Sequence, residues 1–204
     1  VQIPSRSFMK SLRNRCTETG TLLVLDEIQC GLGRTGKYFA FEHYAILPDI
    51  LTLGKALGGG LPIGALVANK NILNTFRDNP VLGHITTFGG HPIASAAAAA
   101  FCTVLKNEIN LKEIERIGSI LEEIVVKHPK ILSCRRIGMM FAFDMESAEL
   151  VSKVVHQCLN KGLITFWFLS HPNSFRLSPP LTISENEIIK AGNLIYNAIS
   201  ESIS

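Results

Sequence analysis

Two nearly uninterrupted apolar runs constrain the fold of this chain more than any other feature. They are TLLVLDE at residues 21–27 and DILTLG at residues 49–54, and neither alternates regularly between apolar and polar residues. Strands buried on both faces have this pattern, and such strands are typical of parallel sheets. We therefore expect both runs to be buried parallel strands, and the run GALVA at 64–68 to be a third strand.

Helical patterns alternate with these runs. Residues 7–19 repeat apolar side chains every four positions and end before Gly20, which favours a helix closed by a left-handed glycine. Residues 92–107 are rich in small side chains and predict a second, closely packed helix. The alternation predicts an α/β fold with a mostly parallel sheet.

The pattern changes near residue 108. The amphipathic segment that follows Asn110 predicts a capped helix, and Ser184 with Glu187 predicts the capping box of the last helix. The expected elements are a helix at 110–128, a strand at 137–145, a helix at 147–162, strands at 163–169 and 175–178, and a final helix. The sequence therefore predicts two domains, with 1–107 belonging to a larger α/β domain and 108–204 forming a smaller α+β domain.

Composition excludes several classes of function. Hydrophobic residues make up 47% of the 204 residues, which indicates a large core, and the net charge is only +3. No basic run is longer than Arg135-Arg136, so neither nucleic acid nor a membrane surface is an expected partner. The five cysteines are scattered without a C-x-x-C pair, and the histidines lack metal-ligand spacing. We expect a cytoplasmic protein without disulfides or a metal site.

A carboxylate and a lysine are expected to meet at one sheet edge. Asp26 ends the first run and Lys55 follows the second, and ligands of open α/β sheets bind beyond the carboxyl ends of the strands. Glycines at 58–60 leave space there. Pyridoxal phosphate needs a lysine that reacts with its aldehyde and an acid that keeps its ring nitrogen protonated. The pair therefore favours a pyridoxal phosphate site.

Two other functions use similar residues. An apolar strand ending in Asp26-Glu27 is typical of a nucleotide hydrolase, but the chain lacks the phosphate loop G-x-x-x-x-G-K-[ST]. The segment GLGRTG at 31–36 matches the dinucleotide fingerprint G-x-G-x-x-G. However, five residues separate it from the apolar run, and an aromatic segment follows where a helix is required.

Three segments resemble one enzyme family. LLVLDEIQCGLGRTGKYFAFEHYAILPDILTLGKALGGGLPIGA at 22–65 closely resembles the signature region of class III pyridoxal-phosphate-dependent aminotransferases. HITTFGGHPIA at 84–94 and FRLSPPLTI at 175–183 resemble two further family segments, in the same order. The resemblance covers essentially the whole chain. It implies a fold-type-I enzyme, a homodimer with a shared active site, and a chain that is the C-terminal portion of a protein about twice as long.

The resemblance also implies roles for single residues. Lys55 would form the Schiff base with the cofactor and move the proton, and Asp26 would pair with the pyridine nitrogen. Gln29 would lie near the ring hydroxyl. Thr87 would bind the cofactor phosphate of the neighbouring subunit. Arg176 would hold a substrate carboxylate, for which a planar two-pronged guanidinium is suited.

Three further motif residues are given structural roles. Glu27 and Arg34 belong to the signature, and Arg34 is expected to tie down the glycine loop. Family members usually carry Asn where this chain has His91. We expect His91 to be a packed substitute rather than an acid or base.

The resemblance implies transamination from the terminal amine of ornithine or acetylornithine to 2-oxoglutarate. The alternatives are an aminotransferase for 4-aminobutyrate or another omega-amino acid, a catalytically silent paralogue, and a nucleotide hydrolase. Lys55, Asp26 and Arg176 are all present, which argues against a silent paralogue.

Overall fold

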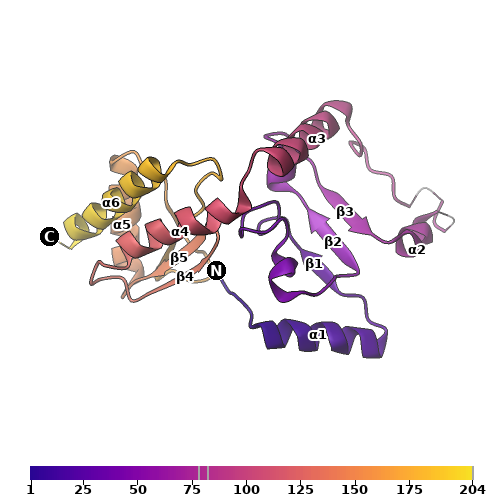
Figure 1. Cartoon of the computed structure of the whole chain (residues 1–204), viewed down its shortest axis with the longest axis horizontal. Helices are drawn as coiled ribbons and strands as arrows, with labels where there is room; N and C mark the ends of the chain where they lie inside the picture. Colours follow the sequence, from indigo (N-terminus) through magenta and orange to yellow (C-terminus); the bar gives the residue numbers. More distant parts are fainter. Residues whose placement is uncertain (78, 82, 204) are drawn as a thin grey trace. The chain divides into compact units, whose positions relative to one another are not determined.

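The chain forms two compact units in the computed structural model, which describes residues 1–77, 79–81 and 83–203 (Figure 1). Unit 1 comprises Val1–Ile3, Arg34–Gly36 and Asn110–Ser204, and unit 2 comprises Pro4–Gly33 and Lys37–Ile109. The functional domains expected at 1–107 and 108–204 stay predictions, and each unit is described here on its own.

Unit 2 contains a small sheet, and helices precede and follow the strands of this sheet in the sequence. Its elements are α1 (Arg6–Thr19), β1 (Val24–Asp26), the 3₁₀ helix η1 (Ala40–Tyr44), β2 (Ile50–Leu53), the 3₁₀ helix η2 (Lys55–Gly58), β3 (Ala65–Ala68), α2 (Lys70–Leu73), the 3₁₀ helix η3 (Asn74–Phe76) and α3 (Pro92–Asn107). The predicted helices at 7–19 and 92–107 are confirmed as α1 and α3. Gly20 closes α1 at φ +67°, as its position predicts.

The sheet of unit 2 has the order β1-β2-β3. Strands β1 and β2 are parallel, as expected, with Asp26 opposite Thr52. Strands β2 and β3 are antiparallel, so the expectation of a mostly parallel sheet is wrong for the described strands. The connection from Leu53 to Ala65 contains only one short 3₁₀ helix. A parallel partner would need a longer crossover, so the chain turns back instead.

The first run is buried on one face only. Leu23 belongs to a core cluster with Met9, Cys16, Tyr44 and Ile46. In contrast, Leu22 and Val24 are each 52% exposed, so the expected burial of both faces is wrong for β1. Because strand side chains alternate in direction, α1 and η1 cover the Leu23 side alone.

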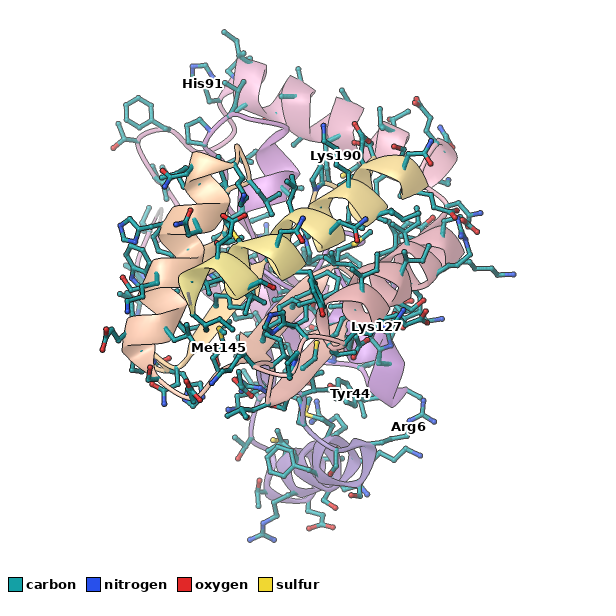
Figure 2. All side chains as sticks on the ribbon, turned by 90° about the vertical axis from the view of Figure 1, so that its left-hand side faces the viewer. Arg6, Tyr44, His91, Lys127, Met145 and Lys190 are labelled. Atoms are coloured by element: carbon teal, nitrogen blue, oxygen red, sulfur yellow. The ribbon has the colours of Figure 1, made fainter. Side chains whose placement is uncertain are left out.

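Unit 1 packs helices on a four-stranded antiparallel sheet of order β4-β5-β7-β6. Its elements are α4 (Leu111–Val125), β4 (Ser133–Ile137), β5 (Met140–Asp144), α5 (Ala148–Asn160), β6 (Phe166–Trp167), β7 (Ser174–Leu177) and α6 (Glu185–Ser202). Figure 2 shows α6, which carries Lys190, beside α4, which ends next to Lys127. Phe141, Phe143 and Phe175 are fully buried in the core.

Local signals located the helices of unit 1 better than its strands. Asn110 caps α4, and Ser184 with Glu187 forms the capping box of α6, both as predicted. The strand expected at 137–145 is confirmed as β5 (Met140–Asp144), but it starts later than expected, because Gly138 turns the chain at φ +54° between β4 and β5. The strand expected at 163–169 is restricted to β6. No helix in the described parts of the chain is long and apolar enough to cross a membrane.

Candidate active site

Asp26 and Lys55 lie at the same edge of the unit 2 sheet. Asp26 is the last residue of β1, and Lys55 begins η2 two positions after Leu53 ends the parallel strand β2. Both side chains are exposed. The edge is the carboxyl end of both strands, where open α/β sheets bind ligands.

The Asp26 carboxylate is oriented by its own turn. Oδ1 accepts a hydrogen bond from the backbone amide of Ile28 at 2.9 Å. No described residue donates to Oδ2 in this arrangement, so that oxygen is available to a ligand. Gln29 lies three residues further along the turn and is also exposed. The sheet pairing itself brings only Asp26 and Lys55 to this edge.

The backbone at Lys55 has an uncommon conformation. Lys55 has φ +46°, in the left-handed region that non-glycine residues rarely adopt, and such conformations cluster at functional sites. The preceding Gly54 is extended, and a Cβ there would lie 3.3 Å from Cγ2 of Ile28. At Gly59, φ is +55° and a Cβ would lie 3.3 Å from the Ala97 carbonyl oxygen of α3. The glycines thus allow the turn after Lys55 to pack closely against its neighbours.

Glu27 fixes the loop beyond the site. Glu27 is only 2% exposed, and its carboxylate accepts hydrogen bonds from the backbone amides of Ala40 and Phe41, both at 2.9 Å. The Sγ of Cys30 lies 3.3 Å from the same carboxylate. Burial, followed by the adjacent negative charge of Glu27, raises the pKa of the Cys30 thiol to about 12. The structural role expected of Glu27 is confirmed, and Cys30 is held as an unreactive thiol.

Arg34 anchors the Arg34–Gly36 end of the glycine loop within unit 1. Its Nη1 donates to the carbonyl oxygen of Pro179, and its own carbonyl accepts from the Met139 amide at 2.9 Å. Burial lowers the pKa of the guanidinium. The structural role expected of Arg34 is therefore confirmed, through contacts that sequence reasoning did not identify.

Thr87 and His91 lie on the segment that leads into α3. Thr87 is exposed, and among the described residues no contact joins it to Asp26, Gln29 or Lys55. His91 is the N-cap residue of α3 and is also exposed, as Figure 2 shows at the start of that helix. The expectation that His91 is packed is wrong for this chain, because its side chain is exposed and forms no capping hydrogen bond.

Arg176 lies in unit 1, on β7. Its guanidinium carbon is 5.2 Å from the centre of the Phe166 ring and 5.9 Å from the centre of the Phe168 ring. Sequence reasoning missed both aromatic residues. Their i, i+2 spacing places both side chains on one face of a strand, but only the pairing of β6 with β7 shows that they face Arg176.

The residues at the sheet edge fit a cofactor that carries an aldehyde and a basic ring nitrogen. Lys55 supplies an exposed primary amine, and Asp26 supplies a carboxylate with one uncommitted oxygen. These are the two groups that pyridoxal phosphate requires of its protein. Within the described residues, no cluster of three or more His, Cys, Asp or Glu could hold a metal ion.

Comparison with known proteins gives one family. Residues 1–199 match the family model for class-III aminotransferases. A curated relative, the putrescine aminotransferase of Pectobacterium atrosepticum, is 39% identical in an alignment of 197 positions that covers 92% of this chain and 41% of that protein.

Solved structures give the same fold. The ornithine aminotransferase of Toxoplasma gondii has a TM-score of 0.90 and 30% identity, over 98% of this chain and 48% of that one. The ornithine aminotransferase of Plasmodium yoelii has a TM-score of 0.88 and 31% identity, over 99% and 54%. One structure of the Toxoplasma gondii enzyme has partial occupancy of PLP at its active site. This chain spans about half the length of these proteins.

Proposed function

Because the chain belongs to the class III aminotransferases, which use pyridoxal 5′-phosphate and have the type I fold, we propose that it carries the reacting lysine of a transaminase. The observation that carries the proposal is the meeting of Asp26 and Lys55 at one sheet edge. Residues 1–107 would form part of the cofactor-binding domain and 108–204 the small domain.

Each site residue has a distinct role in the proposal. When bound, pyridoxal phosphate supplies an aldehyde that accepts amines and a ring that withdraws electrons. Lys55 would hold the cofactor through Nζ. Asp26 would keep a proton on the ring nitrogen through its carboxylate, and Gln29 would bind near the ring hydroxyl.

Lys55 would also move the proton of the reaction. Displaced by the donor amine, its neutral Nζ takes a proton from the carbon that bears the amine. In the second half-reaction Nζ returns a proton to the carbon of the acceptor. Arg176 would bind a carboxylate of the oxo acid, taken to be 2-oxoglutarate, through paired N–H donors.

The amino donor is proposed to be a compound with a primary amine at the end of an unbranched chain. Ornithine or acetylornithine is favoured by the segments TTFGG and FRLSPPLTI, and two of the similar structures are ornithine aminotransferases. Putrescine is the second candidate, supported by the 39% identity to a putrescine aminotransferase. 4-Aminobutyrate is a further alternative.

A homodimer belongs to the proposal because Thr87 is expected to bind the cofactor phosphate of a second subunit. Its exposure in the single chain is compatible with such a contact. The five free cysteines support a reducing compartment such as the cytoplasm.

The test is to identify the lysine that binds the cofactor. The protein that carries this sequence would be loaded with pyridoxal phosphate, reduced with borohydride, digested and analysed by mass spectrometry. We expect the label on Lys55, no label in Lys55→Ala, and an unchanged label in Lys70→Ala, which removes another exposed lysine of unit 2. A label on another lysine, or none, would refute the assignment.

The donor is tested on the same loaded protein. Ornithine, acetylornithine, putrescine and 4-aminobutyrate would be added in turn while the visible absorbance of the cofactor is followed. Loss of absorbance with ornithine or acetylornithine but not with putrescine supports the favoured donor. The reverse result would select putrescine.

A further inference from the structure

We propose that Phe166 and Phe168 are positioning residues that hold the guanidinium of Arg176 ready for a carboxylate. The identity of that carboxylate, the oxo acid of a transamination, rests on the proposed function. The arrangement itself rests on contacts within unit 1.

Strand pairing brings the three side chains together. Phe166 lies directly opposite Arg176 in the antiparallel pair of β6 and β7. Phe168 is two residues further along, and its amide donates to the Ser174 carbonyl at 3.3 Å, so the pairing continues past β6. Phe168 is thus the diagonal neighbour of Arg176, and diagonal positions are within reach of aromatic side chains.

The two rings lie at distances at which a cation is attracted to an aromatic face. The guanidinium carbon is 5.2 Å from one ring centre and 5.9 Å from the other, and the attraction operates within about 6 Å. A guanidinium that stacks on a ring uses its flat face, so its N–H groups, which lie in the plane, stay available. Carboxylates bind to those in-plane donors in pairs.

Arg176 differs from the other arginines of unit 1 in its hydrogen bonding. Arg34 donates to Pro179, Arg116 to Glu113 and Glu185, Arg135 to Asp144, and Arg136 to Glu115 and Glu122. Among the described residues, none accepts a hydrogen bond from the Arg176 side chain or forms an ion pair with it. The aromatic rings hold a cation in place without occupying its donors.

The exposure of the contact fits this role. Phe166 is 45% exposed, and Arg176 is half-buried on a strand whose other members, Ser174, Phe175 and Leu177, are buried. The base of Arg176 is therefore anchored in the core, while an anion can reach its guanidinium. A long side chain fixed in this way loses less conformational entropy when it binds.

The experiment measures binding of an unreactive dicarboxylate, glutarate, to the full, cofactor-loaded protein by calorimetry. Phe166→Leu removes the ring and keeps a similar volume, and Phe166→Tyr keeps the ring. Phe8→Leu, which changes an exposed phenylalanine of unit 2, is the matched control. Thermal unfolding of each variant would verify that the fold is intact.

We expect Phe166→Leu to weaken glutarate binding roughly two- to fivefold, with Phe166→Tyr and Phe8→Leu close to wild type. The loss should be smaller in an Arg176→Lys background, because a lysine ammonium cannot lie flat on the ring as a guanidinium does. In transamination, the KM of the oxo acid should rise and kcat should change little.

The possible outcomes separate this inference from the proposed function. Three results would overturn the inference. They are equal glutarate binding by the wild type and Phe166→Leu, a loss of affinity from Phe166→Leu that is as large in the Arg176→Lys background as in the wild type, and no glutarate binding by the wild type. Ring-dependent glutarate binding in a protein without transaminase activity would support the inference and refute the proposed function.

Discussion

The Nδ1 atom of His128 accepts a hydrogen bond from the backbone amide of Lys130 at 3.1 Å. Because an amide can only donate, Nδ1 carries no proton, and Nε2 is the protonated nitrogen that donates to the Ser200 hydroxyl at 3.2 Å. His128 is 3% exposed, and its ring packs edge-on against Tyr196. The fold therefore holds His128 in its neutral form.

This arrangement predicts a loss of stability in mild acid. Burial, followed by the positive charge of Lys130, lowers the pKa of His128 below its usual 6.5. Between that value and the lower folded pKa, the unfolded chain binds a proton that the folded chain does not. The free energy of unfolding should be highest above about pH 6.5. It should fall as the pH decreases from that value toward the lower pKa of His128 in the folded protein.

Denaturant unfolding at a series of pH values from neutral to mildly acid would measure the effect. His128→Gln should remove most of the pH dependence, while His156→Gln, at an exposed histidine of α5, should keep it. A wild-type profile that is flat over this range would contradict the prediction.

Glu27→Gln is expected to destabilise the protein by about 2 kcal/mol. The carboxylate accepts from two amides, at Ala40 and Phe41, whereas a glutamine side chain has only one acceptor oxygen and would turn its NH₂ group toward a donor. Denaturant unfolding would give the difference. Glu18→Gln, which changes an exposed ion pair of α1, should alter the free energy by well under 1 kcal/mol.

Gly118→Ala should destabilise unit 1 even though alanine favours helices. A Cβ at this position in α4 would lie 2.5 Å from the Gly138 carbonyl oxygen, which belongs to backbone and cannot easily move. Overpacking should outweigh the gain in helix propensity and leave a net loss of about 1 kcal/mol or more. Ser119→Ala, at the next position of the helix, should change the unfolding free energy little, and an equal loss there would refute the argument.

His91→Asn is expected to stabilise α3 by roughly 1 kcal/mol. His91 stands at the N-cap but its side chain forms no capping hydrogen bond, whereas an asparagine oxygen can accept from a backbone amide of the first turn. The Ala94 amide should then exchange more slowly with solvent. His91→Ala should leave that exchange rate near wild type, since no capping bond is lost.

The sequence was sufficient where a structural signal is local. Gly20, Asn110 and the pair Ser184 and Glu187 end or begin helices as predicted, because a cap depends on residue types within four positions. The location of Asp26 and Lys55 at one sheet edge also followed from the sequence, because parallel neighbouring strands end on the same side.

The sequence was insufficient where long-range contacts decide the structure. Strand β4 was missed because its two arginines make it resemble a surface loop. In the fold, Arg136 binds Glu115 and Glu122 of α4, and Arg135 binds Asp144 of β5. The aromatic neighbours of Arg176 depend on the register of β6 and β7. Neither relationship is visible before the strands are paired.

Neither compact unit is a continuous length of chain, and this limits how the protein can be divided. Arg34–Gly36 belongs to unit 1, although unit 2 contributes the residues on both sides of it. A fragment that begins at Asn110 would leave the Pro179 carbonyl and the Met139 amide without their Arg34 partners. Such a fragment should unfold more readily than the same residues in the intact chain. To regain the lost contacts, the fragment would need a separately added peptide that contains Arg34–Gly36.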